Sequence, residues 1–218
     1  MLFLIRHGET FWNADGRLQG QCDTKLNGRG REQARQSGRL LAKLVPDASE
    51  TSFIASPLIR ARESLEILMG ELVAKTALEA VMPYTVDDRL KELGFGRWEG
   101  LTWKEVRRDA PKEYAARDAD VWNIAPPGGE SYASLANRAG PLLAELRSGT
   151  VIVSHGGITR IALHLFAGMG PEAAAKAMIR QGDVLVLDEA RTRWASGAVL
   201  EMGLSPLPAG EVGRLRER

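Results

Sequence analysis

The chain has 218 residues, of which 44% are hydrophobic and 26% are charged, the composition of an ordinary folded protein. Twenty-nine basic against 28 acidic residues leave a net charge of +1, which excludes the basic excess typical of a nucleic-acid-binding surface. The single cysteine, Cys22, excludes an intrachain disulfide, and no apolar run approaches the roughly 20 residues of a membrane span. We therefore expect a cytoplasmic protein that binds neither nucleic acid nor membrane.

The first third of the chain predicts two buried strands, each followed by a helix. Leu2 to Ile5 is entirely apolar, as in a strand that is buried on both faces, and Thr51 to Ala55 has a similar pattern. After a loop rich in Gly, Asn, Asp and Gln, Asn27 can cap a helix that extends to about Leu44. Ser56-Pro57 predicts the N-cap and first position of the next helix. Its apolar residues recur in steps of three and four, at Leu58, Ala61, Leu65, Leu68 and Leu72.

A third strand is expected near Met82 to Val86, and the stretch from Leu93 to Gly129 differs from its surroundings. That stretch is rich in aromatic and charged residues, contains three prolines and shows no strand pattern. Thr102 and Glu105 form a capping-box pattern for a short helix within it. We expect residues 93–129 to be a small helical and loop insertion that lies over the active site.

The last third of the chain returns to the alternation of helices and strands. Residues 1–204 are expected to form a single domain, and residues 205–218, with two glycines and charged residues near the end, a flexible tail. The expected elements are a helix that starts at Ser131 and bends at Pro141, a strand at Thr150 to Ser154, a helix at Ile158 to Met169, and closing strands at Asp183 to Asp188 and Ala198 to Met202.

This order of elements predicts the fold class and the place of the site. Strands that alternate with helices indicate an α/β protein, a three-layer α/β/α sandwich around a mostly parallel sheet. In such sheets, ligands bind at the carboxyl ends of the strands.

Polar residues follow several of the expected strands at that edge. Arg6 and His7 come directly after the first strand, and His155 after the strand at 150–154. Arg60 lies in the first turn of the helix after the second strand, and Glu92 follows the third. Each alone is more often a structural or solvated residue, but two histidines and two arginines at one point suit a dianionic phosphoryl group. Glu92 is the nearest acid that could protonate a leaving oxygen.

Four motifs, in this order, resemble those of the histidine phosphatase superfamily, also called the phosphoglycerate mutase-like family. The match extends from about residue 2 to residue 202. The motifs are Arg6-His7-Gly8-Glu9-Thr10, Ser56-Pro57-Leu58-Ile59-Arg60-Ala61, Arg89-Leu90-Lys91-Glu92 with Gly96-Arg97-Trp98-Glu99-Gly100, and Ser154-His155-Gly156-Gly157.

The resemblance implies a role for each matched residue. His7 would be the nucleophile that forms a phosphohistidine, with its other ring nitrogen donating to a backbone carbonyl. Arg6, Arg60 and His155 would clamp the phosphoryl oxygens, and Glu92 would act as general acid and then as base. The resemblance implies that this protein needs no metal and, as a phosphatase, no cofactor, and that its substrate is a small phosphorylated metabolite; homodimers are common in the family. Further substrate contacts would come from Asn13, Gln19, Gly20 and the amide of Gly156.

The sequence offers other candidates for the general acid, and two further residues have unassigned roles. Asp87, Asp88 and Glu99 are alternatives to Glu92 as the acid, although Glu99 is expected to be structural. Cys22 is expected to be an incidental loop thiol, and His164 to serve helix packing.

Three functions are open, of which a phosphatase is favoured. Phosphoglycerate mutases in the resembling family usually carry a Tyr and a Lys after the acid, where this chain has Phe95 and Trp103. The extra cations that a bisphosphate cofactor needs are expected to be few, so the chain resembles the hydrolase branch, which includes broad-specificity and α-ribazole phosphatases. The alternatives are a cofactor-dependent phosphoglycerate mutase and a phosphoryl-binding protein without turnover. Aromatic residues of the insertion would suit a leaving group with a ring or apolar portion: Trp98, Trp103, Tyr114 and Trp122.

Overall fold

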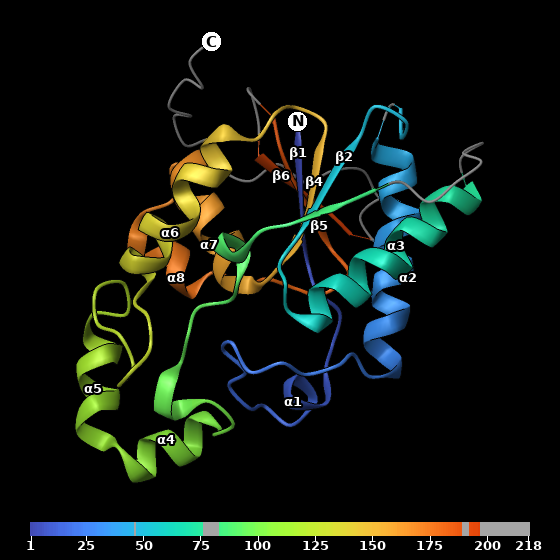
Figure 1. The fold of residues 1–218 in the computed structure, drawn as a ribbon. Helices are drawn as coiled ribbons and strands as arrows, with labels where there is room; N and C mark the ends of the chain where they lie inside the picture. The colour runs from blue at the N-terminus through green and yellow to red at the C-terminus, as the bar shows by residue number, and fades with distance from the viewer. Residues whose placement is uncertain (46, 76–82, 189–191, 197–218) are drawn as a thin grey trace.

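The centre of the fold is a six-stranded sheet with the strand order β3-β2-β4-β1-β5-β6 (Figure 1). The structure is a computed structural model and describes residues 1–45, 47–75, 83–188 and 192–196. The first four strands in this order are parallel, whereas β5 is antiparallel to β1, and β6 to β5. The strands are β1 (Leu2–Arg6), β2 (Ser52–Ala55), β3 (Thr85–Val86), β4 (Thr150–Ser154), β5 (Val184–Leu187) and β6 (Thr192–Ala195).

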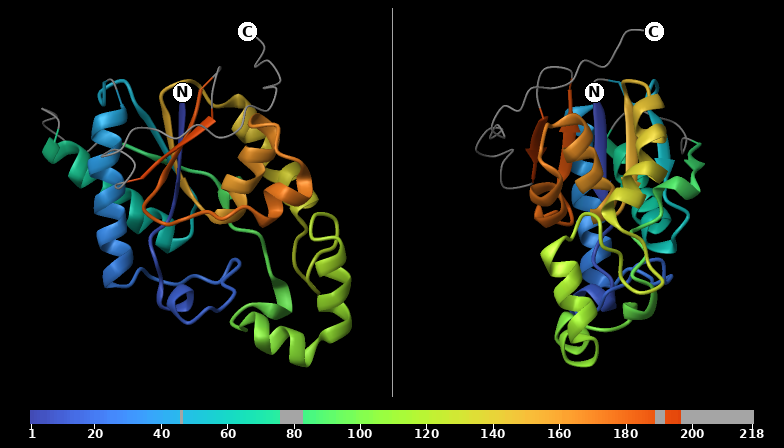
Figure 2. Two further views of the ribbon diagram at one scale, coloured as in Figure 1. Left: turned by 180° about the vertical axis from the view of Figure 1, so that it is seen from behind. Right: turned by 90° about the vertical axis from the view of Figure 1, so that its left-hand side faces the viewer.

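Helices cover both faces of the sheet, which confirms the three-layer α/β/α sandwich (Figures 1 and 2). Side chains alternate across β1: Leu2 and Leu4 pack in one apolar core, and Phe3 and Ile5 in the other. The first core includes residues of α6 (Tyr132–Glu145), α7 (Gly156–Phe166) and α8 (Pro171–Lys176). The second includes residues of α2 (Gly28–Leu44) and α3 (Ile59–Lys75).

Three short helices lie beyond the carboxyl ends of the parallel strands, at the bottom of Figure 1. They are α1 (Phe11–Ala14), α4 (Trp103–Asp109) and α5 (Pro111–Ala119), and 3-10 turns occur at Asp88–Leu90 and Gly96–Trp98. The predicted capping box of α4 is confirmed, because Glu105 N donates to Thr102 Oγ1 and Thr102 N donates to the Glu105 carboxylate. Residues 93–129 thus form the helical cover that the sequence predicted over this edge, called the roof below.

Several boundaries correct the sequence predictions. The helix predicted to start at Ser56-Pro57 begins at Ile59, because Ser56 Oγ hydrogen-bonds His155 and the Ile59 amide donates to Asp23 Oδ1 at 2.7 Å. The helix predicted from Ile158 begins at Gly156. Neither α1 nor α8 was predicted.

Two other predictions concern the closing edge of the sheet and the tail. β6 pairs with β5 and forms one edge of the sheet. The sequence did not predict β6. The predicted strand at Ala198 to Met202, the tail at 205–218 and the start of the predicted third strand lie outside the described residues.

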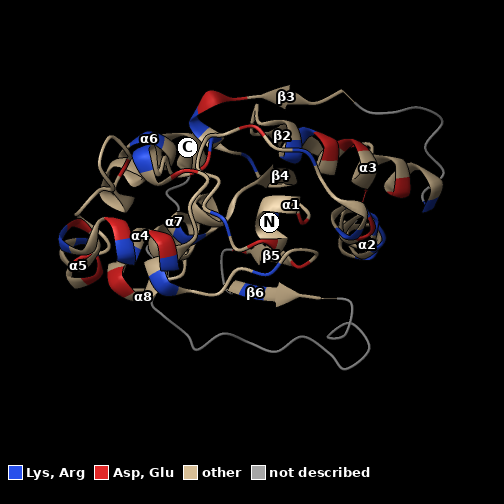
Figure 3. Cartoon of the chain, turned by 90° about the horizontal axis from the view of Figure 1, so that it is seen from below, with Lys and Arg blue, Asp and Glu red and all other residues tan. Residues whose placement is uncertain are grey.

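Charges of both signs are interspersed on the end that carries the roof. Viewed from that end, α4 and α5 alternate Lys or Arg with Asp or Glu (Figure 3). Among the described residues, no helix has the length and apolar character needed to cross a membrane.

Candidate active site

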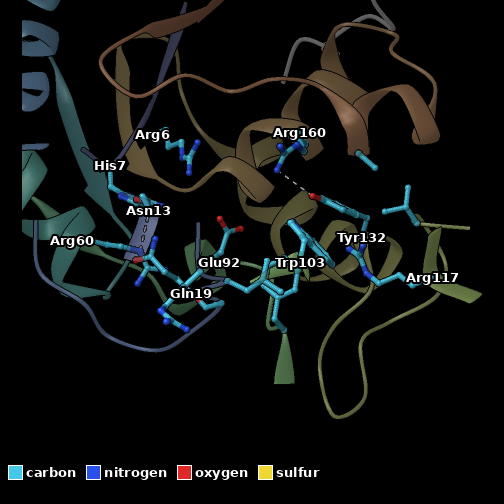
Figure 4. A pocket seen from close by; sticks show the side chains of 16 residues that line it. Arg6, His7, Asn13, Gln19, Arg60, Glu92, Trp103, Arg117, Tyr132 and Arg160 are labelled. Atoms are coloured by element: carbon cyan, nitrogen blue, oxygen red, sulfur yellow. Dashed lines mark hydrogen bonds between the residues drawn. The ribbon is translucent and has the colours of Figure 1, made fainter. Parts of the chain in front are cut away.

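A cavity of about 330 Å³ lies at the carboxyl end of the sheet and contains most of the predicted site residues (Figure 4). Seven of the nine predicted residues line it, namely Arg6, His7, Asn13, Gln19, Gly20, Arg60 and Glu92. The other two, His155 and Gly156, lie next to these residues but are not part of the cavity lining. The convergence predicted from the sequence is therefore found in the structure.

The His7 ring is buried and held at both of its nitrogens. Nδ1 lies 2.7 Å from the Gly8 carbonyl oxygen, so this nitrogen carries the proton, as the resemblance implied. Nε2 is then unprotonated, and its lone pair accepts a hydrogen bond from Arg60 Nε at 3.3 Å. Burial and the cations Arg60 and Arg6 hold the pKa of His7 well below the usual imidazole value of 6.5. At neutral pH the ring is uncharged, as a nucleophile requires.

Arg60 is fully buried and its guanidinium is fixed by the loop that follows β1. One terminal nitrogen donates to the Gly20 carbonyl at 2.7 Å, and the other to the Cys22 carbonyl at 2.8 Å. Gly20 was predicted to contact substrate. It lines the cavity, but its carbonyl binds Arg60, and its φ of +51° is a conformation that favours glycine.

Glu99 holds this loop against the roof. Its carboxylate accepts hydrogen bonds from the backbone amides of Gln21 and Phe95 and from the Cys22 thiol. A structural role for Glu99 is thereby confirmed, and Cys22 is a hydrogen-bonded loop thiol. Glu99 raises the pKa of Cys22 to about 11.

Arg6 and His155 leave polar atoms free in the interior of the site. Arg6 donates to the Ile179 carbonyl at 2.7 Å, while its Nε is buried without a partner among the described residues. His155 Nε2 lies 2.7 Å from Ser56 Oγ, and its Nδ1 is likewise buried and unpartnered in the described part of the chain. The His155 and His7 rings meet edge to face, with their centroids 5.1 Å apart.

The Glu92 carboxylate lies in the cavity and is oriented by the start of α7. Its Oε1 accepts from the Gly157 amide at 3.0 Å and from the Leu93 amide at 2.8 Å. A Cβ on Gly157 would overlap this carboxylate, so the close approach requires glycine. The rivals Asp87 and Asp88 lie outside the cavity lining and pair with Arg89 and Lys91.

Asn13 and Gln19 present amide groups to the cavity. Asn13 Oδ1 accepts from the Thr10 amide and from the Gln181 side chain, and Gln19 Oε1 accepts from the hydroxyls of Thr10 and Thr24. With their oxygens occupied, both side chains can direct NH₂ donors at a bound anion. Their NH₂ groups have no partner among the described residues.

Three arginines that the sequence analysis did not place in the site also line the cavity, so the expectation that further cations would be few is wrong. They are Arg17, Arg117 in α5 and Arg160 in α7; Tyr132, whose hydroxyl accepts a hydrogen bond from Arg160, also lines the cavity. Arg160 follows Gly156 by four residues, so the helical repeat alone could have placed it on the same face of α7. For Arg117 the sequence carries no such signal, because its position depends on how the roof packs. Of the predicted aromatic residues, Trp103 lines the cavity, as does Phe95.

Comparison with known proteins agrees with this geometry. The family model for the histidine phosphatase superfamily (branch 1) matches residues 2–199. The chain is 37% identical to glucosyl-3-phosphoglycerate phosphatase of Mycolicibacterium vanbaalenii over 170 residues, which cover 72% of this chain and 69% of the relative. It is 31% identical to the protein named "Probable phosphoglycerate mutase GpmB" of Erwinia tasmaniensis over 222 residues, covering 99% and 95% of the two chains.

Solved structures give the same result. The structure of mycobacterial glucosyl-3-phosphoglycerate phosphatase in complex with VO3 superposes with a TM-score of 0.72 and 28% identity, covering 96% of this chain and 98% of that one. Because the family model spans nearly the whole chain and the cavity holds the residues of its motifs, the chain belongs to the histidine phosphatase superfamily.

Proposed function

We propose that this protein is a phosphatase that hydrolyses a small phosphate monoester through a phosphohistidine on His7. The observation that carries the proposal is the state of that ring: Nδ1 is bound to the Gly8 carbonyl, which leaves the Nε2 lone pair in a cavity with Arg60 and Glu92. A neutral imidazole nitrogen beside cations suits attack on a dianionic phosphoryl group.

The first step transfers the phosphoryl group to the enzyme. His7 Nε2 attacks phosphorus, the bond between phosphorus and the ester oxygen breaks, and Glu92 donates its proton to the departing alcohol. In the second step, water attacks phosphorus as Glu92 accepts a proton from it, and the phosphorus–nitrogen bond breaks. Inorganic phosphate leaves, and His7 and Glu92 return to their starting states.

The charge that builds on the phosphoryl oxygens is met by fixed donors. Arg6 Nε and His155 Nδ1 have no partner among the described residues, and the NH₂ groups of Asn13 and Gln19 border the cavity. Arg60 is already oriented by two carbonyls, so little reorganisation is needed when substrate binds.

Hydrolysis is favoured over mutase activity by two observations. The relatives with 36% and 37% identity are named as phosphatases, and one at 33% identity is named as a metal-independent phosphoserine phosphatase. In addition, Phe95 and Trp103 place apolar rings in the cavity. A mutase remains the second candidate, because Arg117 and Arg160 supply cations that a bisphosphate cofactor needs and a mutase-named relative matches 99% of the chain.

Two parallel assays test the proposal. The protein is incubated with p-nitrophenyl phosphate and, separately, with 3-phosphoglycerate plus 2,3-bisphosphoglycerate. We expect hydrolysis that is lost in His7→Ala and retained in His164→Gln, a matched control because His164 lies outside the cavity lining and hydrogen-bonds the Met169 carbonyl. Phosphoglycerate interconversion far faster than hydrolysis would establish the mutase instead. Inactivity in both assays, together with binding of inorganic phosphate, would indicate a binding protein.

Two inhibitors and a chelator refine the test. Vanadate and inorganic phosphate should compete with substrate, since both resemble the clamped group. Activity should survive EDTA, because every step above is assigned to a protein side chain; complete loss with EDTA would contradict this mechanism.

A further inference from the structure

The hydroxyl of Ser56 contacts the ring of His155 in the interior of the site. Ser56 directly follows β2 and His155 directly follows β4, so the parallel pairing of these strands brings the two side chains together. Ser56 Oγ lies 2.7 Å from His155 Nε2, and both residues are fully buried. The contact therefore joins a serine after one strand to a histidine, after the next, that is proposed to hold the phosphoryl group.

The other contact of Ser56 indicates which group is the donor. A serine hydroxyl carries one proton, and its oxygen can also accept. Ser56 Oγ accepts from the Leu58 amide at 3.3 Å, and among the described residues His155 Nε2 is the acceptor within reach of the hydroxyl proton. If Nε2 donated instead, a buried hydroxyl proton would be left without an acceptor in that part of the chain, which is costly. The serine therefore donates, and the histidine nitrogen accepts.

The second ring nitrogen of His155 is consistent with this direction. Nδ1 is buried and has no partner among the described residues. Burial, and then the cation Arg60, hold the pKa of His155 well below 6.5, so the ring is neutral at pH 7 and carries one proton. With Nε2 accepting from Ser56, that proton is on Nδ1 and is available to an anion. A lone pair on Nδ1 would instead repel a phosphoryl oxygen.

We propose that Ser56 is a positioning residue for phosphoryl transfer: its hydroxyl donates to His155 Nε2 and thereby keeps the ring proton on Nδ1, as a donor to a phosphoryl oxygen. His7 has its proton on the same ring atom, where the Gly8 carbonyl accepts it and Nε2 is left to attack phosphorus. One tautomer thus makes His7 a nucleophile and His155 a donor, because opposite nitrogens of the two rings are occupied. This inference rests on the proposed phosphatase function and adds the residue that prepares His155 for it.

Nitrogen NMR of the histidine rings tests the tautomer in the native protein, without any substitution. The chain has three histidines, so the signals can be assigned with His164→Gln and His7→Gln. At pH 7.5 we expect His155 to have a protonated Nδ1 and an unprotonated Nε2. A proton on Nε2, alone or together with one on Nδ1, would overturn the inference.

Ser56→Ala removes the donor and should release the tautomer. We expect the His155 signals to shift towards a protonated Nε2, and inorganic phosphate to bind roughly tenfold more weakly. The value of kcat/KM should fall roughly tenfold to a hundredfold, because a donor to the phosphoryl group is weakened. The fall should be equal for p-nitrophenyl phosphate and glycerol 3-phosphate, since His155 is proposed to contact the phosphoryl group and not the leaving alcohol.

Two further variants separate this role from a general effect on the fold. Ser56→Thr keeps a hydroxyl at the same position and should restore the tautomer and most of the activity. Ser37→Ala is the matched control: it removes a buried serine hydroxyl that hydrogen-bonds the Gln33 carbonyl within α2, and neither phosphate binding nor kcat/KM should change. Thermal unfolding establishes that each variant is folded.

The outcomes separate this inference from the proposed function, because NMR and phosphate binding do not need turnover. If the native protein hydrolyses neither ester, the phosphatase function is wrong, and the tautomer still tests the role of Ser56. If hydrolysis depends on His7 but His155 carries its proton on Nε2, only the inference is overturned. Native phosphate affinity and kcat/KM in a folded Ser56→Ala would also overturn it. If the Ser56 variants do not fold, the tautomer of the native protein decides.

Discussion

Arg60 Nε donates to His7 Nε2 across 3.3 Å, so the nitrogen proposed to attack phosphorus is joined directly to a residue proposed to hold the phosphoryl oxygens. The contact needs an unprotonated Nε2 and aligns the Nε2 lone pair with the guanidinium. Two loop carbonyls fix that guanidinium in turn, at Gly20 and Cys22. Orientation of the nucleophile therefore depends on a loop that is itself held by Glu99.

Replacement of Arg60 by lysine should show how much the activity depends on the positive charge of this residue and how much on the hydrogen bonds of its guanidinium. Arg60→Lys keeps the charge but cannot donate to Gly20, Cys22 and His7 together, so we expect kcat/KM for p-nitrophenyl phosphate to fall roughly 100-fold or more. Arg62→Lys, exposed on the same helix, should have native activity and serves as the control. If Arg60→Lys kept most of its activity, the forked contacts would not matter for the reaction.

Glu92→Gln should slow the hydrolysis of alkyl esters far more than that of aryl esters. An alkoxide needs a proton as it leaves, so glycerol 3-phosphate turnover should fall roughly 100-fold to 10,000-fold, whereas nitrophenolate departs with little assistance. Steady-state kinetics of both esters give the comparison. Glu113→Gln, on the exposed surface of α5, controls for the loss of one acidic residue. Equal losses for the two esters would show that Glu92 is not the acid.

Gly157→Ala should reproduce that signature although residue 92 is still a glutamate. The new methyl group would overlap the Glu92 carboxylate and displace it, so alkyl ester hydrolysis should fall and the fold should persist. In Gly70→Ala the new methyl meets no atom within 4 Å, and the variant should be fully active and about 0.5–1 kcal/mol more stable. Native alkyl ester turnover in Gly157→Ala would mean that the acid does not need this contact.

Acidification should destabilise the protein through its two buried histidines. The pKa values of His7 and His155 lie well below 6.5, chiefly because both rings are buried and also because of nearby arginines. Between pH 6.5 and these lowered pKa values, the unfolded chain binds protons that the folded chain does not. The free energy of unfolding should therefore fall with pH below 6.5, by up to about 1.4 kcal/mol per pH unit for each histidine.

Urea unfolding between pH 7.5 and 5.0 measures this dependence. His7→Gln should weaken it by about half, since one of the two groups is removed. The same slope in His7→Gln and in the native protein would assign the effect to other groups.

Cys22 should resist alkylation. Its pKa of about 11, against a usual 9.0, reduces the thiolate fraction at pH 8 about a hundredfold. Glu99→Gln removes the carboxylate whose hydrogen bond with the Cys22 thiol, together with its negative charge, raises the pKa of Cys22, so iodoacetamide should then react faster at pH 8. Mass spectrometry of the modified chain gives the rates, and Cys22→Ser is the blank. Rapid alkylation of the native protein would contradict the Cys22–Glu99 hydrogen bond.

The residues that the sequence could place are those that directly follow a strand. Arg6 is the last residue of β1, and His7 and His155 directly follow β1 and β4. Because these strands are parallel neighbours in the sheet, the residues at their carboxyl ends lie close together. The start of α3 could not be predicted from the sequence, because the acceptor for the Ile59 amide is Asp23, 36 residues earlier in the chain. Local patterns of capping cannot show a partner supplied by tertiary structure.

The same limit applies to the second half of the cavity. Arg117 resembles any charged residue on the surface of a short helix, and its burial against Phe95 and Trp103 arises only when the roof packs on the sheet. The sequence consequently predicted the end of the cavity that holds His7 and Arg60 and underestimated the charge at the other end.

The pairing of β1 with β4 has a consequence for how long the site holds together. Arg6 is in register with Ser154, and the His7 amide donates to the Ser154 carbonyl at 2.9 Å, so the two histidines are spaced by the sheet itself, at about its interstrand distance of 4.8 Å. Hydrogen exchange at the His7 amide should therefore require opening of the central sheet, whereas amides of α4 and α5 can exchange through local opening. The two histidine backbones then share the lifetime of the core, whereas α4 and α5 can open locally and more often than the central sheet.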